Sequence, residues 1–270
     1  EMLTKERKAM ATHIHEMEGR WRDGLAWLDN PDFNWEFWNN FRFHVWWHYG
    51  LFLIELERYD EALELYDTRI RSEKSDAPTD TASATSTLWR LESVGVDVGE
   101  RWDELANIAE QRLQDHMFAY FDCHTMVALA ASNRENSALR MLTSLKNIKA
   151  DSTVTQSQIF TEIGIPLCEA IYAYHNDEYG LAVDLMMPIR DEFYRLGGSH
   201  VQRDIFVQTL LHSALKSRRY SLAQALLAER VSIKPNSGTS WKLYARALEG
   251  NGQNSDARKA NRRAAAALSI

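Results

Sequence analysis

Two histidines with helical spacing are the residues of this sequence best placed to do chemistry. His44 and His48 are four positions apart, so on a helix both imidazoles project from one face. Such a pair can hold a metal ion when a third ligand comes from elsewhere, and His13 or Glu16 could supply it. The sequence has no HExxH motif and no cysteine-rich spacing, so we assign no metal and no cofactor from this pattern.

The same histidines allow two other interpretations. They lie beside Trp46 and Trp47, and aromatic walls with a few convergent polar groups are typical of small-molecule pockets. Alternatively, the imidazoles only form hydrogen bonds to neighbouring helices. The residues alone leave all three interpretations open.

A second polar cluster extends over residues 197–204 and reads Gly-Gly-Ser-His-Val-Gln-Arg-Asp. Ser199 can cap the helix that follows, whose free N–H groups could hold an anion. Arg203 could clamp a carboxylate or phosphate, with His200 and Asp204 beside it. The alternative is a plain helix start, with Arg203 and Asp204 in structural ion pairs.

Two other places combine charged or nucleophilic side chains. Arg90 lies among apolar residues, where a structural pair with Glu92 or Asp80 is the more common role. Cys123 and His124 could form a nucleophile pair, but adjacent residues on a helix point in different directions. We therefore expect no catalytic pair there and assign no catalytic residue anywhere.

The composition indicates the elements that must position these residues. Only 5 prolines and 12 glycines in 270 residues favour long helices over many short strands. The net charge is -7 without an evident Lys/Arg stripe, so we expect no nucleic-acid partner. Two cysteines make no disulfide framework, which predicts a reducing, cytoplasmic location. No apolar run reaches about 18 residues, so we expect no membrane span.

A repeat of the tetratricopeptide (TPR) kind organises these helices. Residues 45–66 place aromatic and small residues where a TPR unit needs them, at Trp46, Gly50, Tyr59, Ala62 and Tyr66. An aromatic followed three residues later by a small or apolar residue recurs at Trp21/Gly24, Tyr59/Ala62, Trp102/Leu105, Tyr179/Ala182 and Tyr220/Ala223, with weaker copies at Glu135/Ala138 and Asn254/Ala257.

This pattern predicts an all-α fold, specifically a right-handed α-α superhelix of about seven TPR-like helix pairs. We expect one domain over residues 1–270, closed by a capping helix over 256–270. An irregular helical bundle is the alternative. In the repeat phase, five of the 9 histidines fall on groove-lining positions of the inner helices, namely His13, His44, His48, His124 and His212.

Several stretches of the chain have a specific family resemblance, and they are residues 13–20, 44–48, 88–91, 95–102, 197–204 and Glu229-Arg230. They resemble the tetratricopeptide repeat protein 38 family over roughly residues 10–235. The resemblance implies an α-α superhelix, with no established reaction or ligand. It also implies a longer N-terminus than this chain has, so that the chain looks truncated, and a further histidine where Ala9 stands here.

These observations predict a binding module that holds a small anionic molecule or a peptide end in a concave pocket. An enzyme of the lyase, hydrolase or isomerase class, which uses groove histidines and carboxylates as acid and base, is one alternative. A protein-interaction scaffold is another. We expect no nucleic-acid or membrane partner and keep a homodimer as an option. The predicted ligand-binding residues are His13, Glu16, His44, Trp47, His48, Arg90, His124, His200, Arg203 and Asp204.

Overall fold

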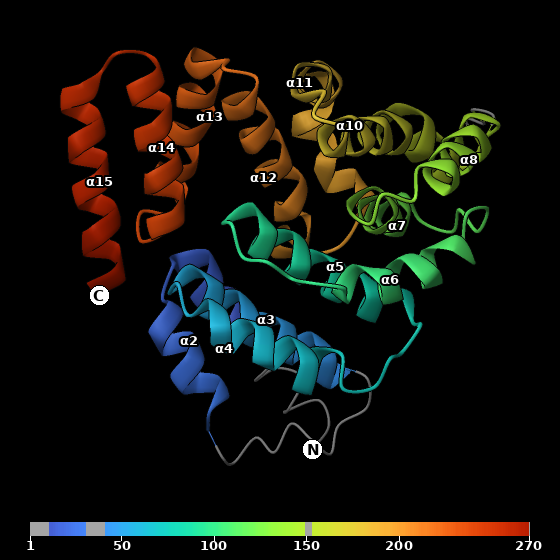
Figure 1. The fold of residues 1–270 in the computed structure, drawn as a ribbon, viewed down its shortest axis with the longest axis horizontal. Helices are drawn as coiled ribbons and strands as arrows, with labels where there is room; N and C mark the ends of the chain where they lie inside the picture. The colour runs from blue at the N-terminus through green and yellow to red at the C-terminus, as the bar shows by residue number, and fades with distance from the viewer. Residues whose placement is uncertain (1–10, 31–40, 149–152, 270) are drawn as a thin grey trace. The chain divides into compact units, whose positions relative to one another are not determined.

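The chain is helical wherever its structure is described. A computed structural model describes residues 11–30, 41–148 and 153–269, and within these ranges it contains no β-strand (Figure 1). The predicted all-α class is therefore confirmed. None of the helices in the described ranges combines the length and apolar character needed to cross a bilayer.

The helices group into two compact units. Unit 1 combines residues 1–73 with residues 214–270, and unit 2 comprises residues 74–213. The single domain expected from the sequence stays a prediction.

Unit 1 is built from helices of both chain ends. Residues 11–18 are helical and are followed by α2 (Trp21–Leu28), α3 (Phe41–Glu55) and α4 (Tyr59–Leu65), which continues into a π-helical turn. The C-terminal part adds α13 (Tyr220–Ile233), α14 (Gly238–Gly250) and α15 (Asn254–Ser269). Helices next to each other along the chain pack together, as α2 does on α3 and α14 on α15.

Unit 2 begins with α5 (Pro78–Ser93), α6 (Arg101–Glu110), α7 (Ala119–Ala131) and α8 (Glu135–Lys146). The short α9 (Thr155–Ile159) leads into α10 (Ile165–His175) and α11 (Tyr179–Met186), after which a 3-10 segment ends at Leu196. The next helix, α12 (His200–Lys216), crosses the boundary between the units. Within unit 2, α7 packs against α5, α6, α8 and α10.

One turn recurs between the helices of each pair. At Glu57 the backbone is left-handed, with φ 59°, and α4 starts two residues later. Around this residue the N–H of Arg58 donates to the carbonyl of Leu53 at 2.9 Å, a helix-ending bond of the Schellman type. The same left-handed turn, with its equivalent bond, occurs at Gly19, Glu57, Asn133, Asp177, Arg218 and Gly252.

A small buried residue follows each of these turns. It is the fourth residue of the second helix, where the two helices of a pair approach closely. At Gly24, an added Cβ would lie 2.4 Å from the Phe52 ring, so this contact excludes a larger side chain. The equivalent alanines are at most 1% exposed and are Ala62, Ala138, Ala182, Ala223 and Ala257. These are the positions that the aromatic/small pattern identified.

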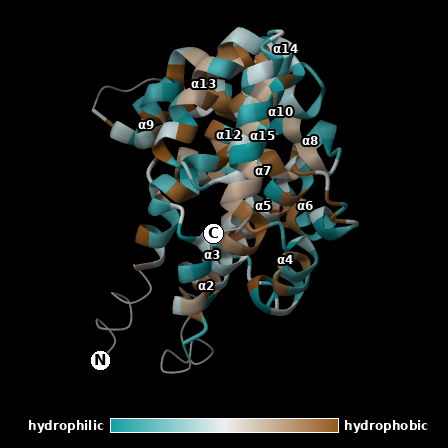
Figure 2. Cartoon of the chain, turned by 90° about the vertical axis from the view of Figure 1, so that its left-hand side faces the viewer, coloured by the Kyte–Doolittle hydropathy of each residue, from teal (hydrophilic) through white to brown (hydrophobic). Residues whose placement is uncertain are grey.

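Helix α3 carries two of the predicted site histidines through the core of unit 1. Phe43, Trp47 and Phe52 on this helix are at most 1% exposed. Most helices show hydrophobic and hydrophilic residues on the same ribbon, as amphipathic helices do (Figure 2). Helix α3 is instead apolar around most of its circumference, so polar groups on it lie in a poorly hydrated environment.

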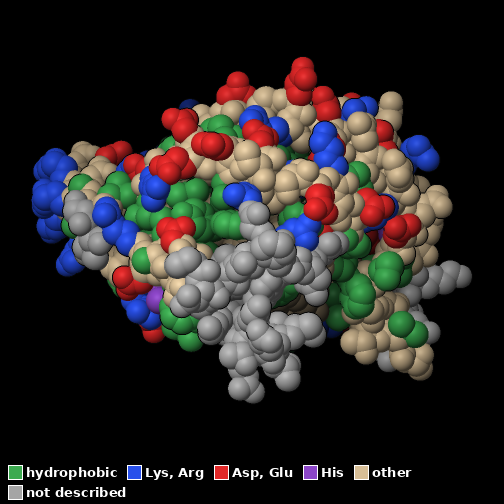
Figure 3. Space-filling view, turned by 90° about the horizontal axis from the view of Figure 1, so that it is seen from below, with side chains coloured by type: hydrophobic (Ala, Val, Ile, Leu, Met, Phe, Trp, Pro, Cys, Tyr) green, Lys and Arg blue, Asp and Glu red, His purple; other side chains and the backbone are tan. Residues whose placement is uncertain are grey.

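Helix α15 closes the C-terminal end of the chain and spans most of the predicted capping segment. Ala257 and Ala260 on one face pack on Ala245 and Leu248 of α14. The other face is basic, although the sequence showed us no Lys/Arg stripe. Basic side chains gather at one end of the surface in Figure 3, and those exposed on α15 are Arg258, Lys259, Arg262 and Arg263.

Candidate functional site

Three imidazoles of unit 1 converge on one point. His13 comes from the helical residues 11–18, while His44 and His48 come from successive turns of α3. One ring nitrogen from each lies within 4.8 Å of the other two. The Nε2 atoms of His13 and His48 are 3.1 Å apart. The sequence predicted this trio only as one of three interpretations, and the structure brings all three side chains together.

The surrounding aromatic residues fix the imidazoles and exclude water. The His44 ring stacks on Trp47 with centroids 5.1 Å apart, and His48 meets the same indole edge-on at 4.7 Å. His48 and Trp47 are each only 1% exposed. Desolvation lowers the pKa of His44 to about 4, and the neighbouring His13 adds to this effect. Desolvation also lowers the pKa of His13, although Glu16 opposes it.

This geometry suits a tetrahedral metal ion. Imidazole binds transition metals through the lone pair of its neutral form, and the lowered pKa values of His13 and His44 favour that form at neutral pH. Zinc–nitrogen bonds of about 2.0–2.1 Å at tetrahedral angles separate two ligand nitrogens by roughly 3.3 Å. The Nε2 atoms of His13 and His48 are already 3.1 Å apart. The three ligand nitrogens lie within 4.8 Å of one another, so the widest pair must approach by at most about 1.5 Å to reach this separation. Side-chain rotation can supply a shift of this size.

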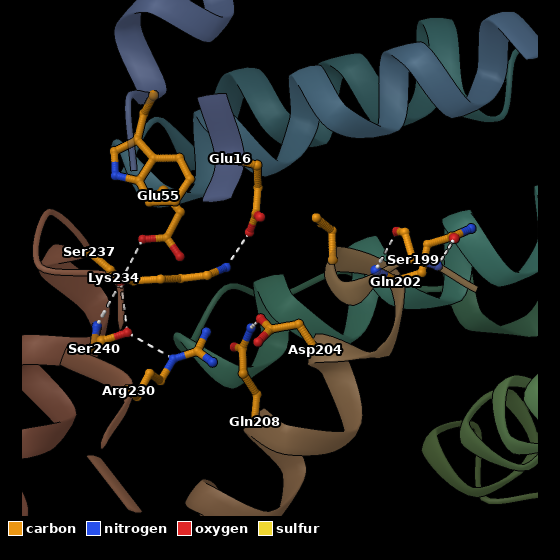
Figure 4. Close-up of polar contacts among 12 residues, drawn as sticks. Glu16, Glu55, Ser199, Gln202, Asp204, Gln208, Arg230, Lys234, Ser237 and Ser240 are labelled. Carbon is orange, nitrogen blue, oxygen red and sulfur yellow. Dashed lines mark hydrogen bonds and ion pairs between the residues drawn. The ribbon is translucent and has the colours of Figure 1, made fainter. Parts of the chain in front are cut away.

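A buried ion pair lies on the same N-terminal helix as His13. Lys234, at the end of α13, donates to Oε1 of Glu16, and both side chains are at most 6% exposed (Figure 4). The other carboxylate oxygen of Glu16 is buried and has no hydrogen-bond partner in the described part of the chain. The pair ties the N-terminal helix to the C-terminal helices of unit 1.

Polar contacts continue around this ion pair. The Ser237 hydroxyl donates to Glu55 at 2.9 Å and also accepts the N–H of Ser240, which caps the start of α14 (Figure 4). Arg230 donates to the Ser240 hydroxyl at 2.9 Å. Desolvation raises the pKa of Glu55, against the opposing effect of Lys234 and Arg230. The sequence pattern did not identify Glu55, Lys234 or Ser237, because their partners are about 180 to 220 residues away.

The predicted site residues are divided between the two units. His13, Glu16, His44, Trp47 and His48 belong to unit 1, where the histidines cluster as described. The other five belong to unit 2 and are Arg90, His124, His200, Arg203 and Asp204.

Arg90 forms hydrogen bonds to backbone and serine oxygens, and its predicted pairing with Glu92 or Asp80 stays a prediction. Its guanidinium donates to the backbone carbonyls of Ser86 and Val201, at 3.1 and 3.3 Å, and to the Ser86 hydroxyl. Arg90 is 5% exposed. These bonds link α5 to the start of α12, so the side chain holds two helices of unit 2 together.

The segment 197–204 contains two glycines and the first turn of α12. Arg203 donates through Nη1 to the carbonyls of Gly197 and Gly198, and its role as an anion clamp stays a prediction. Ser199 caps α12 as predicted, and Gln202 accepts its backbone N–H in return at 2.7 Å, forming a capping box (Figure 4). The N–H groups expected to be free for an anion at Ser199 and Gln202 are therefore used within the loop.

The remaining predicted residues of unit 2 have varied surroundings. Asp204 is buried and accepts a hydrogen bond from Gln208 at 2.6 Å, whereas His200 is exposed (Figure 4). His124 is 2% exposed and lies in the wall of a cavity between α5, α6 and α7, with Nδ1 bonded to the Tyr120 carbonyl at 2.8 Å; its role in binding a ligand stays a prediction. Desolvation lowers the pKa of His124 to about 4. Its orientation toward the Tyr120 backbone gives it no bond to Cys123.

A Ser–His–Asp arrangement in unit 2 was not recognised in the sequence. His116 bonds to Asp122 through Nδ1 at 2.9 Å and to the Ser144 hydroxyl through Nε2 at 2.8 Å. Burial raises the pKa of Asp122, although His116 opposes it. The three residues come from the α6–α7 loop, α7 and α8, and no local motif joins them. Only the contact between these elements reveals the arrangement.

A scan against protein-family models found no match for this chain. The resemblance to the tetratricopeptide repeat protein 38 family therefore stays a prediction, and the geometry described above is the basis for any functional conclusion.

Proposed function

We propose that this protein binds a transition-metal ion, with Zn²⁺ as the best fit, through His13, His44 and His48. The observation that carries the proposal is the convergence of one nitrogen from each ring within 4.8 Å. Three protein ligands leave one tetrahedral position open, as in zinc sites that bind small molecules or substrates. The metal would then hold the small anionic molecule or peptide carboxylate that the sequence predicts.

The donor set favours zinc over alkaline-earth ions. Calcium and magnesium require oxygen ligands, whereas imidazole suits Zn²⁺, Cu²⁺, Fe²⁺ and Ni²⁺. Neutral imidazoles leave the positive charge of the ion uncompensated. In the poorly hydrated surroundings of α3, an anion at the open position would be electrostatically favourable. This supports an anionic ligand rather than a neutral one.

Equilibrium dialysis of Zn²⁺ against variants of single histidines tests the metal site. His44→Ala and His48→Ala should each weaken zinc binding by more than about 100-fold, because even the loss of an outer hydrogen-bond partner costs 10- to 100-fold. His15→Ala is the matched control, since His15 belongs to the same N-terminal helix but its ring contacts Trp27 instead. Zinc binding that survives both ligand variants would refute the proposal.

The open position is tested separately with acetate and inorganic phosphate. We expect calorimetry to detect anion binding only to the zinc-loaded protein. Zinc binding without anion binding would support the metal site and contradict its role in binding an anionic ligand.

We also propose that the helix pairs are TPR-like units of a right-handed superhelix of about seven pairs, as the resemblance to the tetratricopeptide repeat protein 38 family implies. The support is the recurring left-handed turn followed by a small buried residue. The last two turns, at Arg218 and Gly252, are 34 residues apart, which is the TPR period. Small-angle X-ray scattering would distinguish a superhelix from a compact bundle.

A further inference from the structure

We propose that Ser144, His116 and Asp122 form a catalytic triad that hydrolyses carboxylic esters. A nucleophile within hydrogen-bond reach of a base, which is itself oriented by a third group, is the geometric signature of such sites. The Ser144–His116 and His116–Asp122 distances are 2.8 and 2.9 Å. The three residues all belong to unit 2, so the inference is independent of the metal site.

The hydrogen bonds assign a role to each residue. A carboxylate only accepts, so Nδ1 of His116 carries the proton and donates to Asp122. In the neutral ring Nε2 then accepts from the Ser144 hydroxyl. Asp122 is buried, whereas the Ser144 side chain is half-buried and within reach of an external substrate. Hydrogen bonds in this direction, from Ser144 to His116 and from His116 to Asp122, are the ones that activate a serine for attack.

His116 adopts a left-handed backbone conformation, with a φ of 41°. Histidine is one of the L-residues enriched in this region. Here the two bonds made by the ring, and a T-shaped contact with Phe160, hold the histidine in place.

The surroundings of the triad indicate the substrate class. A cavity of about 40 Å³ between α5, α6 and α7 has Asp122 in its wall, together with Asp115 and Met117 on either side of His116. Leu105 and Ile108 add an apolar lining. Met117 and Phe118 expose 66% and 44% of their surface. Neither His116 nor Ser144 lines this cavity, so the substrate class rests on the exposed apolar surface of Met117 and Phe118 next to His116, which suits an ester with an apolar group.

The reaction follows from these roles. The Ser144 oxygen bonds to the ester carbonyl carbon while its proton passes to Nε2 of His116. The bond from that carbon to the alcohol oxygen breaks, and the alcohol leaves with the proton from His116. Water then attacks the acyl-serine and gives one proton to His116, which returns it to the departing Ser144 oxygen. The products are a carboxylic acid and an alcohol.

A fluorophosphonate probe and p-nitrophenyl acetate test this proposal on the full chain in the presence of EDTA. We expect one covalent adduct per chain, which peptide mapping locates on Ser144, and slow release of p-nitrophenol. Ser144→Ala should abolish both. Ser132→Ala is the matched control, because that hydroxyl bonds only to backbone carbonyls at the end of α7. Asp122→Asn should slow labelling by about 10²- to 10⁴-fold.

Circular dichroism would reveal a variant that fails to fold. The site of labelling in the wild-type protein tests Ser144 as the nucleophile even in that case. An unlabelled native chain, an adduct on another residue, or equal labelling of folded Ser144→Ala would each overturn the proposal.

Discussion

Removing Lys234 should destabilise unit 1 strongly, because it isolates a buried carboxylate. Lys234→Met keeps a long apolar stem but deletes the ammonium group that donates to Glu16. The two side chains are 5% and 6% exposed, so water cannot replace the lost partner without local opening. The second carboxylate oxygen already lacks a hydrogen-bond partner in the described part of the chain.

The expected cost follows from this burial. Breaking a buried ion pair by removing one partner costs about 3–5 kcal/mol, since an uncompensated charge remains. At roughly 2–4 °C per kcal/mol for a chain of this size, the melting temperature should fall by about 10 °C. Glu16→Gln combined with Lys234→Met removes both charges of the pair and should recover part of the loss, because the buried Glu55 still loses its favourable interaction with Lys234.

Urea unfolding followed by circular dichroism measures these differences. Lys242→Met is the matched control, because Lys242 pairs with Glu57 in the same unit but is 49% exposed. That pair should contribute less than about 1 kcal/mol. If Lys234→Met cost no more than Lys242→Met, or if the double variant were as unstable as the single one, an uncompensated buried charge would not explain the loss of stability.

Three further predictions concern other parts of the chain. The folded pKa of His124 is about 4 against 6.5 for the unfolded chain, so the unfolded state binds more protons between these values. The neutral His124 therefore contributes about 3 kcal/mol to the free energy of unfolding above pH 6.5, and this contribution is lost as the pH falls to 4. Urea unfolding of His124→Leu should show a free energy of unfolding that depends less on pH over this range. Arg218→Gly should raise the free energy of unfolding by about 0.5–1 kcal/mol, because φ is 59° there, and Arg218→Val should lower it. The buried thiols of Cys123 and Cys168, 3.8 Å apart, should react with Ellman's reagent only after unfolding, and fast reaction of the native protein would contradict their burial.

The helix pairs could be predicted from the sequence because their determinants are local. An aromatic residue and a small residue three positions later mark the start of the second helix, as at Tyr59 and Ala62. The backbone reverses two residues earlier whether glycine is present or not: Glu57 and Arg218 adopt the same left-handed conformation as Gly19. The packing of the small residue, rather than the turn residue itself, therefore carries the signal.

The candidate site was only partly predictable. His44 and His48 share one helix face, so their spacing alone placed them together, and the approach of His13 was one option among several. Glu16 and Lys234 are 218 positions apart, and no pattern in either segment indicates their contact. Arg203 shows a different difficulty: the carbonyls of Gly197 and Gly198 accept hydrogen bonds from Nη1 of a guanidinium predicted to bind a ligand, and the sequence did not indicate these contacts.

X-ray absorption spectroscopy of the chain loaded with one equivalent of Zn²⁺ reports the ligands of the metal ion. We expect three imidazole nitrogens at about 2.0–2.1 Å plus one oxygen or added anion, with the imidazole signal reduced in His44→Ala. Failure to retain zinc, or an all-oxygen shell unchanged in His44→Ala, would contradict a metal site at His13, His44 and His48.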